Sequence, residues 1–359
     1  MVAYYYHKSN TKDKIMELIP AGFTPKLFNK EDCQTLKNST TFKADLKLNL
    51  KNNKNISEKQ VLNPYFITGY TDGDGSFSIS VKARKTAKFG YLIAPVYSIG
   101  ANINPYNKML LENIQEFFGG VGSISKCANM YIYEVSSLKN LSIIRKHFLN
   151  YPLETSKSIH FLLWCQIIDL LNKKEHYTYE GFKKILSIKS VFPKGLTINQ
   201  IEAFPNIVPI IKPEFTPSEK PLNPHWITGF VQADGTFGLN YIKDERVRLG
   251  FNCQPQFSIS QHKRDLTILK RILNDLGCGL LIPSSPKRDV HRISISSMNS
   301  LVNIVIPFFE RYPLSGSKNL DFKDFSKGIQ IIKNKAHLTS EGLAELKDLA
   351  NAMNSNRKF

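Results

Sequence analysis

The sequence predicts an α+β protein composed of two related halves in tandem. Leu62–Phe77 reads LNPYFITGYTDGDGSF and Leu222–Phe237 reads LNPHWITGFVQADGTF, so the stretch recurs without a gap at an offset of 160. A second short match, Tyr-Pro-Leu, begins at Tyr151 and again at Tyr312, at an offset of 161. Because there are only two copies and they lie far apart, they indicate a duplicated domain and not a solenoid of short repeats.

The composition fits a folded protein with a negatively charged partner. A chain of 359 residues with 42% hydrophobic residues is long enough for two domains, each with an apolar core. The net charge of +18 predicts binding to nucleic acid or to an anionic membrane surface. The most apolar segment, His160–Leu171, is too short to span a bilayer and contains Gln166 and Asp169, which favours nucleic acid.

The first elements of the repeat are a helix and a strand. Pro64–Asp74 is a predicted helix because proline is favoured in the first helical turn. Gly75 follows directly, and we expect it to close the helix in a left-handed conformation. In Ser76–Arg84 polar and apolar residues alternate, which is typical of a half-buried strand.

The remaining elements of the two halves occur in matching order, with strand sets alternating with helices. In the first half we expect strands at Tyr97–Ile103, Ser123–Lys126 and Met130–Val135, and helices at Leu110–Phe118, Leu138–Leu149 and Lys157–Leu171. In the second half we expect strands at Thr236–Ile242, Gln256–Gln261 and His291–Ser296, and helices at Asp265–Leu276, Leu301–Phe309 and Lys318–Lys333.

Segments of different composition flank and connect the halves, which we expect at residues 59–180 and 222–335. Residues 1–58 are rich in Lys and Asn with weak periodicity, so we expect a poorly ordered N-terminal extension. Residues 181–221 hold six of the 18 prolines and are predicted to be an extended linker. Residues 336–359 are expected to be a C-terminal tail with one further helix.

Small residues line one face of each repeated helix. Gly69 and Gly73 are four positions apart, as are Gly229 and Ala233. Residues at this spacing share a helix face, so each helix has a stripe without bulky side chains. Two such stripes would let the helices pack closer than the usual distance of about 8–10 Å.

Side-by-side packing would bring Asp74 and Asp234 together at the C-terminal ends of the two helices. The helix dipole disfavours negative charge at that end, so a pair of acids there is explained by a divalent cation between them. Carboxylate, carbonyl and phosphate oxygens are the ligands that Mg²⁺ prefers.

Two other interpretations of the motif fit the sequence less well. Asp-Gly is common in simple turns, which suits a single copy better than a doubled pattern with matched small residues. A helix-loop-helix calcium site requires glycine at the sixth and glutamate at the twelfth loop position. Phe77 and Ala83 stand at those positions, so the calcium loop is excluded.

The doubled motif resembles the signature of the LAGLIDADG homing endonucleases, in their single-chain form with two motif copies. The resemblance covers about residues 62–333, including the strand order and the Tyr-Pro-Leu-x-x-x-Lys segments. It implies two pseudo-symmetric αββαββα halves packed through their motif helices. It also implies that the antiparallel sheets form a saddle over double-stranded DNA.

The resemblance also implies the metal ligands. The final acid of each motif, Asp74 and Asp234, would bind Mg²⁺ near the scissile phosphates, together with Gly73 and Ala233. The earlier acidic position is Asp72 in the first copy and Gln232 in the second. This departure spares the metal ligands and affects the polarity of the helix interface.

Three further residues resemble accessory groups of the family's active sites. Gln261 ends the strand FSISQ, and the first half has Ile103 at the position we expect to correspond, so the two sites should be unequal. Lys157 and Lys318 follow Tyr-Pro-Leu at the same distance. Lysine in a first helical turn opposes the helix dipole, which favours a role toward phosphate over that of a solvated surface residue.

The implied reaction is metal-assisted phosphodiester hydrolysis, which makes a double-strand break in DNA with each acid serving one strand. The polar strand faces of the two halves differ, so we expect a long asymmetric target rather than a palindrome. Arg and Lys pair with guanine edges, whereas hydroxyls and amides are more permissive. The candidate DNA-binding residues are Ser76, Ser78, Ser80, Lys82, Arg84, Asn240, Arg246, Arg248, Ser258, Ser260, Arg292 and Ser294.

The main alternative is a maturase, which binds the RNA of its host group I intron as a splicing cofactor on the same scaffold. A non-catalytic DNA-binding module is disfavoured because both acids are present. A membrane-surface protein is disfavoured because no basic amphipathic helix is apparent. We expect a monomer encoded in an organelle, most plausibly a fungal mitochondrion, from the Lys- and Asn-rich composition and the habits of the family.

Overall fold

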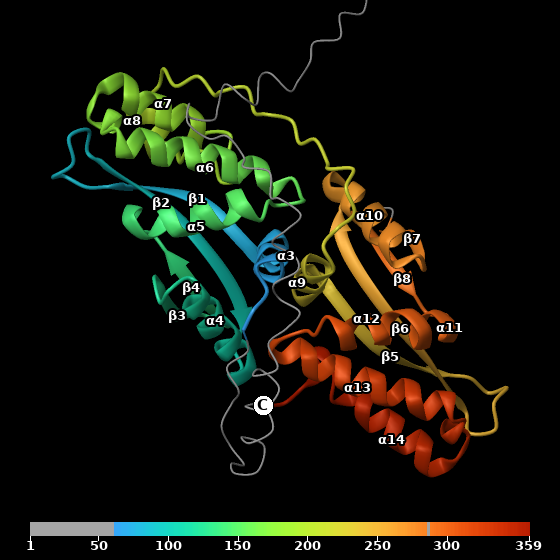
Figure 1. Cartoon of the computed structure of the whole chain (residues 1–359). Helices are drawn as coiled ribbons and strands as arrows, with labels where there is room; N and C mark the ends of the chain where they lie inside the picture. The colour runs from blue at the N-terminus through green and yellow to red at the C-terminus, as the bar shows by residue number, and fades with distance from the viewer. Residues whose placement is uncertain (1–60, 286–287) are drawn as a thin grey trace, which may run out of the picture. The chain divides into compact units, whose positions relative to one another are not determined.

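The two helices formed by the repeated sequence lie side by side at the centre of the fold (Figure 1). The computed structural model describes residues 61–285 and 288–359, so the predicted extension at residues 1–58 lies outside the described residues. Helix α3 spans Pro64–Asp74 and α9 spans Pro224–Asp234. Each follows an asparagine whose side chain accepts a backbone N–H of the first turn at 2.9 Å. This cap and the adjacent proline explain why both helices begin where they do.

An antiparallel four-stranded sheet follows α3 in the order β1-β2-β4-β3. Phe77 and Ile79 face the core as the alternation predicted. Strand β2 begins six residues before the expected Tyr97, because Tyr91–Val96 pairs with β1. The elements are β1 (Gly75–Ala83), β2 (Tyr91–Asn102), α4 (Pro105–Phe117), β3 (Ser123–Cys127), β4 (Met130–Val135), α5 (Leu138–Asn150), α6 (Lys157–Asn172), α7 (Tyr179–Lys189) and α8 (Ile198–Ala203).

The second half repeats this arrangement, with the sheet order β5-β6-β8-β7. The two halves belong to one compact unit. The α+β fold with two pseudo-symmetric halves is therefore confirmed. Strand β7 was not predicted, since its sequence LLIPSS contains a proline and lacks alternation. The elements are β5 (Gly235–Lys243), β6 (Phe251–His262), α10 (Leu266–Leu276), β7 (Leu280–Ser285), β8 (Arg288–Ile295), α11 (Met298–Ser300), α12 (Ile306–Arg311), α13 (Gly316–Lys333) and α14 (Ser340–Asn351).

Each half has its own core around the last residue of the repeat. Phe77 contacts the rings of Tyr97, Phe148, Phe161 and Trp164 at centroid distances of 5.1 to 5.4 Å. Phe237 contacts the rings of Phe257, Phe309, Phe322 and Phe325 at 5.0 to 5.5 Å. The phenylalanine therefore recurs because it joins the sheet of each half to its covering helices.

Gly75 does not take the left-handed conformation that we predicted. Its φ and ψ are −79° and 161°, and it is the first residue of β1. Glycine is needed because a Cβ there would lie 2.5 Å from Cγ2 and 2.8 Å from Cα of Thr71. The constraint at the motif's end is thus a close approach between the strand and the helix. Gly277, with φ of 68°, does close α10 in the left-handed conformation.

The predicted extended linker also begins differently. Within residues 181–221, the part up to Ala203 contains most of α7 and all of α8. Phe182, Ile185 and Leu186 of α7 are buried in the first core, at the spacing of an amphipathic helix. The chain becomes extended only beyond α8 (Figure 1). Within the described residues, no helix combines the length and the apolar composition required to cross a membrane.

The four predicted interface residues form the contact between α3 and α9. A Cβ at Gly69 would overlap the carbonyl oxygen of Trp226 and lie 2.8 Å from the backbone nitrogen of Phe230. A Cβ at Gly229 would overlap the carbonyl of Phe66 in the same way. Farther along, a Cβ at Gly73 would overlap that of Ala233. The helices therefore touch backbone to backbone, as the small-residue stripes predicted.

This contact predicts that Gly69→Ala destabilises the protein strongly. The added methyl group meets backbone atoms, which cannot rotate away, so we expect a loss of about 3 kcal/mol or more in the free energy of unfolding. Gly238→Ala is a matched control, since a Cβ there would have its nearest neighbour at 3.5 Å. Chemical denaturation of both variants checks this. Equal stability of the two variants would contradict the proposed packing constraint.

Candidate active site

Asp74 and Asp234 come together at the ends of the paired helices. Oδ2 of Asp234 would lie 3.3 Å from a Cβ placed on Gly73, the residue before Asp74. Burial and, to a smaller extent, the negative charge of Asp74 together raise the pKa of Asp234 to about 7, against the opposing effect of Lys157, Lys318 and Gln261. Burial also raises the pKa of Asp74, and Lys157 and Lys318 oppose that shift. The two acids are thus close enough for the charge of Asp74 to disfavour ionisation of Asp234.

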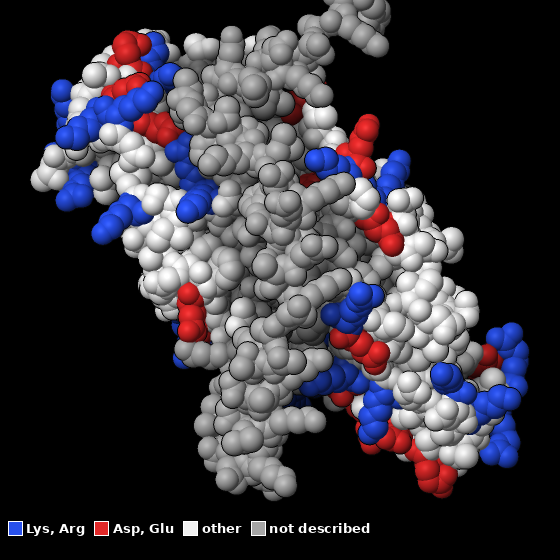
Figure 2. All heavy atoms as spheres, in the orientation of Figure 1, with Lys and Arg blue, Asp and Glu red and all other residues white. Residues whose placement is uncertain are grey.

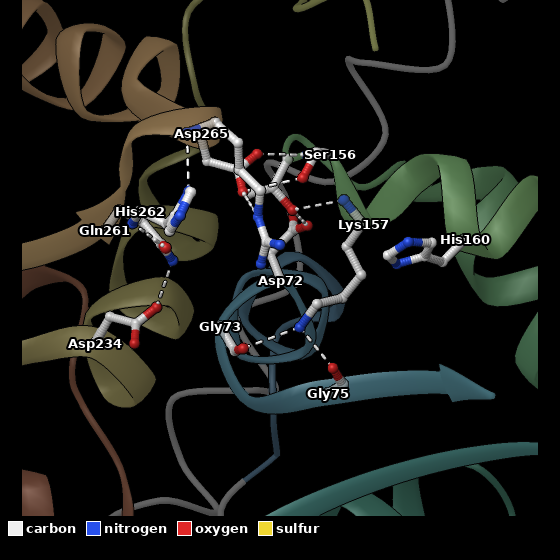
Figure 3. A network of polar contacts seen from close by, with 12 residues as sticks. Asp72, Gly73, Gly75, Ser156, Lys157, His160, Asp234, Gln261, His262 and Asp265 are labelled. Atoms are coloured by element: carbon white, nitrogen blue, oxygen red, sulfur yellow. Dashed lines mark hydrogen bonds and ion pairs between the residues drawn. The ribbon is translucent and has the colours of Figure 1, made fainter. Parts of the chain in front are cut away.

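The two predicted lysines reach the same place from the first turns of α6 and α13. Nζ of Lys157 donates to the carbonyl oxygens of Thr71, Gly73 and Gly75 at 2.7, 2.9 and 2.5 Å. Nζ of Lys318 donates to the carbonyl of Gly235 at 2.6 Å. Each ammonium group therefore lies at the negative end of the motif helix of its own half. Figure 3 shows this for Lys157.

Gln261 lies at the second acid and has no counterpart at the first. Its Nε2 donates to Oδ2 of Asp234 at 2.8 Å. Sheet register gives its equivalent: Gly75 pairs with Ile99 and Gly235 with Ile259. The residue two positions after Ile99 is Ala101, so the expected correspondence with Ile103 is wrong. The expectation of unequal sites nevertheless holds, because a methyl group replaces an amide.

A polar cavity of about 590 Å³ lies beside Asp74. Asp74, Ala101, Ala233 and Lys318 line it. In the part of the chain that the structure describes, no group of three or more His, Cys, Asp or Glu side chains could hold a metal. The possible metal ligands at the acid pair are the carboxylate oxygens of Asp74 and Asp234 and the backbone carbonyl oxygens at the helix ends. Such a set fits a hard divalent cation and does not fit zinc or copper.

A family model for the LAGLIDADG endonucleases matches this chain twice, over residues 67–168 and 227–329. This chain belongs to the LAGLIDADG endonuclease family. Each match starts inside a motif helix. The first ends in α6, which carries Lys157, and the second ends in α13, which carries Lys318. The resemblance inferred from the doubled motif is thereby confirmed.

Similar proteins include probable intron-encoded endonucleases 3 and 2 of Neurospora crassa, with 33% and 32% identity over 79% and 81% of this chain. The matches span 52% and 65% of those relatives, so this chain corresponds to about half to two thirds of their length. The mitochondrial protein RF1 of Saccharomyces cerevisiae is 26% identical over 96% of this chain and 68% of its own length.

Two crystal structures of the LAGLIDADG homing endonuclease I-SmaMI are similar in fold. The structure bound to cleaved DNA has a TM-score of 0.79 and 34% identity, covering 83% of this chain and 98% of that one. The structure bound to an uncleaved DNA target in the presence of calcium ions has a TM-score of 0.78 and 35% identity, covering 81% and 99%.

The predicted DNA-binding residues of this LAGLIDADG chain lie on the strands and hairpins, but they are not equally available. Ser258 is only 8% exposed, and Ser294 accepts a hydrogen bond from Gln256 at 2.7 Å. Arg246 forms an ion pair with Asp244. The others with exposed or half-buried side chains are Ser76, Ser78, Ser80, Lys82, Arg84, Asn240, Arg248, Ser260 and Arg292.

Basic side chains are also numerous away from these strands. On the face shown in Figure 2, they gather over α6 to α8 and over α13 and α14, with acidic side chains among them. The positive charge on this face is therefore mixed with negative charge and not collected into one patch.

Asp72 and Gln232 act in the interface and not at the acids. Asp72 accepts hydrogen bonds from the backbone nitrogen of Glu154 at 2.9 Å, from Thr155 at 2.5 Å and from Nε1 of Trp226 at 2.9 Å. Burial raises its pKa to about 6, opposed by these donors.

Gln232 Oε1 accepts the equivalent backbone N–H, that of Ser315, at 3.1 Å. The residues that correspond to Trp226 and Thr155 around Gln232 are Phe66, from the first half, and Gly316, and neither has a side-chain donor. A neutral amide therefore suffices where the first half has a carboxylate. The sequence departure at Gln232 is matched by departures in its surroundings.

The raised pKa of Asp234 predicts how pH affects the metal-free protein. The unfolded aspartate has a pKa of about 4. Between that value and about 7 the folded state binds more protons, so the contribution of this residue to stability falls as pH rises through this window. Asp234→Asn should raise the thermal midpoint relative to the unaltered protein at pH 8, but not at pH 5. Thermal unfolding in EDTA measures this, and an equal difference at both pH values would contradict it.

Proposed function

We propose that this chain is a site-specific DNA endonuclease that makes a double-strand break by divalent-metal-dependent hydrolysis of phosphodiester bonds. One observation carries the proposal: Asp74 and Asp234 meet at the ends of packed motif helices, beside Lys157, Lys318 and Gln261. The relatives named as intron-encoded endonucleases and the I-SmaMI complexes with DNA support it.

The roles of the site residues follow from their contacts. Asp74 and Asp234, with the carbonyls of Gly73 and Ala233, would hold Mg²⁺, which when bound activates water and stabilises the leaving oxygen. Gln261 fixes one carboxylate oxygen of Asp234 and leaves the other oxygen for the metal. The carbonyl of Gly73 already accepts from Lys157, and its second lone pair remains available.

The lysines supply positive charge where a scissile phosphate would approach. Burial lowers the pKa of Lys157, and Asp72 and Asp74 oppose that shift. Lys318 has a lowered pKa for the same reason, opposed by Asp321. Such partly desolvated ammonium groups interact more strongly with phosphate than solvated ones do.

The sheets would read the DNA through their polar faces. The two faces carry different residues, so an asymmetric target is expected, and a single chain with two halves would bind it as a monomer. Similarity to the mitochondrial protein RF1 and to intron-encoded endonucleases supports an organelle-encoded origin in a fungal mitochondrion. The maturase alternative stays a prediction, which binding to candidate group I intron RNA tests.

Replacing either acid should abolish double-strand cleavage and leave DNA binding intact. For Asp74→Asn and Asp234→Asn we expect a loss of roughly 10³-fold or more, because each removes a metal ligand. A plasmid library of randomised sites with Mg²⁺ identifies the target, and cleavage of that target is then timed for each variant. Asp275→Asn, on α10, is the control. Undiminished cleavage by either acid variant would reject the proposal.

Arg292 offers a sharp test of recognition by the sheet. Its Nε is buried and has no hydrogen-bond partner among the described residues, and it lies on a strand next to Ser260. Arg292→Ala should therefore weaken binding by about 1–3 kcal/mol and relax selectivity at one position. Binding to the recovered target and its single-base variants in Ca²⁺ measures both effects. Lys327→Ala, where Lys327 pairs with Glu345 on the helical side, should change neither.

A further inference from the structure

The loop before Lys157 is held by the opposite half of the chain. Asp265, at the start of α10, accepts two hydrogen bonds from Ser156: one from its backbone nitrogen at 2.7 Å and one from its hydroxyl at 3.0 Å (Figure 3). Ser156 directly precedes Lys157, so these bonds fix the backbone from which the lysine side chain extends. Asp265 is only 5% exposed.

The same arrangement occurs with the halves exchanged. Asn107 of α4, in the first half, accepts from the backbone nitrogen and the hydroxyl of Ser317, both at 3.0 Å. Ser317 directly precedes Lys318. Asn107 is also buried, at 8% exposure. The serine before each lysine therefore donates two hydrogen bonds to a side chain of the other half.

Asp265 is not simply capping its own helix. It stands at the N-cap position of α10, where an aspartate usually accepts an N–H from the next turn. No side-chain cap bond is formed there. Its carboxylate instead bonds to Ser156 and, more weakly, to Arg264 at 3.3 Å. Both carboxylate oxygens of Asp265 thus accept a hydrogen bond from the loop of the opposite half.

Each loop has a second anchor in the motif helix of its own half. Asp72 holds Glu154 and Thr155, and Gln232 holds Ser315. With Asp265 or Asn107 at the other end, each loop is fixed at two points just before its lysine. Placement to within about 1 Å matters because a shift of that size can cost 10²-fold in rate.

Resting on the proposed function, we propose that Asp265 and Asn107 are positioning residues, each of which sets the lysine of the opposite half for DNA cleavage. Neither lysine is then correctly placed unless the halves are docked. The acceptor is a carboxylate in Asp265 and a neutral amide in Asn107, and hydrogen bonds to a carboxylate are about twice as strong as neutral ones. Loss of Asp265 should therefore slow the reaction more than loss of Asn107.

The experiment compares single-turnover cleavage of the recovered target, resolved by strand, with binding in Ca²⁺. Asp265→Ala should slow cleavage by roughly 10–100-fold while Kd changes less than about threefold. The DNA strand whose cleavage slows more in Asp265→Ala should be the one that slows more in Lys157→Ala. The strand that slows more in Asn107→Ala should be the one that slows more in Lys318→Ala. Asp265→Asn keeps an acceptor oxygen and should recover most of the rate.

The double variant Asp265→Ala/Lys157→Ala should be no slower than Lys157→Ala alone, because Asp265 acts through that lysine. The control is Asp275→Ala: it removes another α10 carboxylate, which accepts from the backbone of Leu222, and should keep the normal rate. If Asp265→Ala does not fold, Ser156→Ala removes one of the two bonds and should slow the same strand.

Additive slowing in the double variant, a strand bias that follows Lys318, or an unchanged rate in Asp265→Ala and Ser156→Ala would overturn the positioning role. The proposed function is tested separately: undiminished cleavage by Asp74→Asn or Asp234→Asn would reject it. A DNA-cleaving protein that requires both acids but shows additive effects would refute only the inference.

Discussion

The backbone contact between α3 and α9 is the constraint on which the rest of the structure depends. At Gly69 and Gly229 the two helices come so close that a single methyl group would overlap a carbonyl of the neighbour. This closeness brings the last residues of both helices into one place. Since each helix is followed at once by the first strand of its sheet, the same contact also sets how the two sheets begin on either side of the acid pair.

Bringing Asp74 and Asp234 together is unfavourable by itself. Burial and the negative charge of Asp74 oppose ionisation of Asp234, which is why its pKa rises to about 7. The helix dipole also disfavours negative charge at this end of each helix. Lys157 and Lys318 offset part of this cost by placing ammonium groups on the carbonyls at the helix ends. A site that concentrates negative oxygens and is incompletely neutralised by protein cations is suited to a divalent metal.

The halves are similar but not equivalent, and the differences are correlated. Asp72 accepts hydrogen bonds from the side chains of Trp226 and Thr155. The residues that correspond to these two around Gln232 have no side-chain donor. Charged acceptors hold the loop of the first lysine, and amides hold the loop of the second. Gln261 serves one acid, and Ala101 lies at the matching position beside the other. The two halves therefore differ in the residues around the acids, whereas the acid itself is an aspartate in both.

The sequence by itself determined the duplication, the motif helices, most strands and the identity of the paired acids. These follow from a gapless repeat and from periodicity, which are local properties of the chain. Tertiary structure alone decided that Ala101 and not Ile103 matches Gln261, because sheet register depends on pairing between strands. It also decided that Gly75 serves close packing, that α7 belongs to the first core, and that Asp265 and Asn107 reach across the halves. Asp265 lies 109 positions from Ser156, and no local pattern encodes a contact between groups so far apart in the chain.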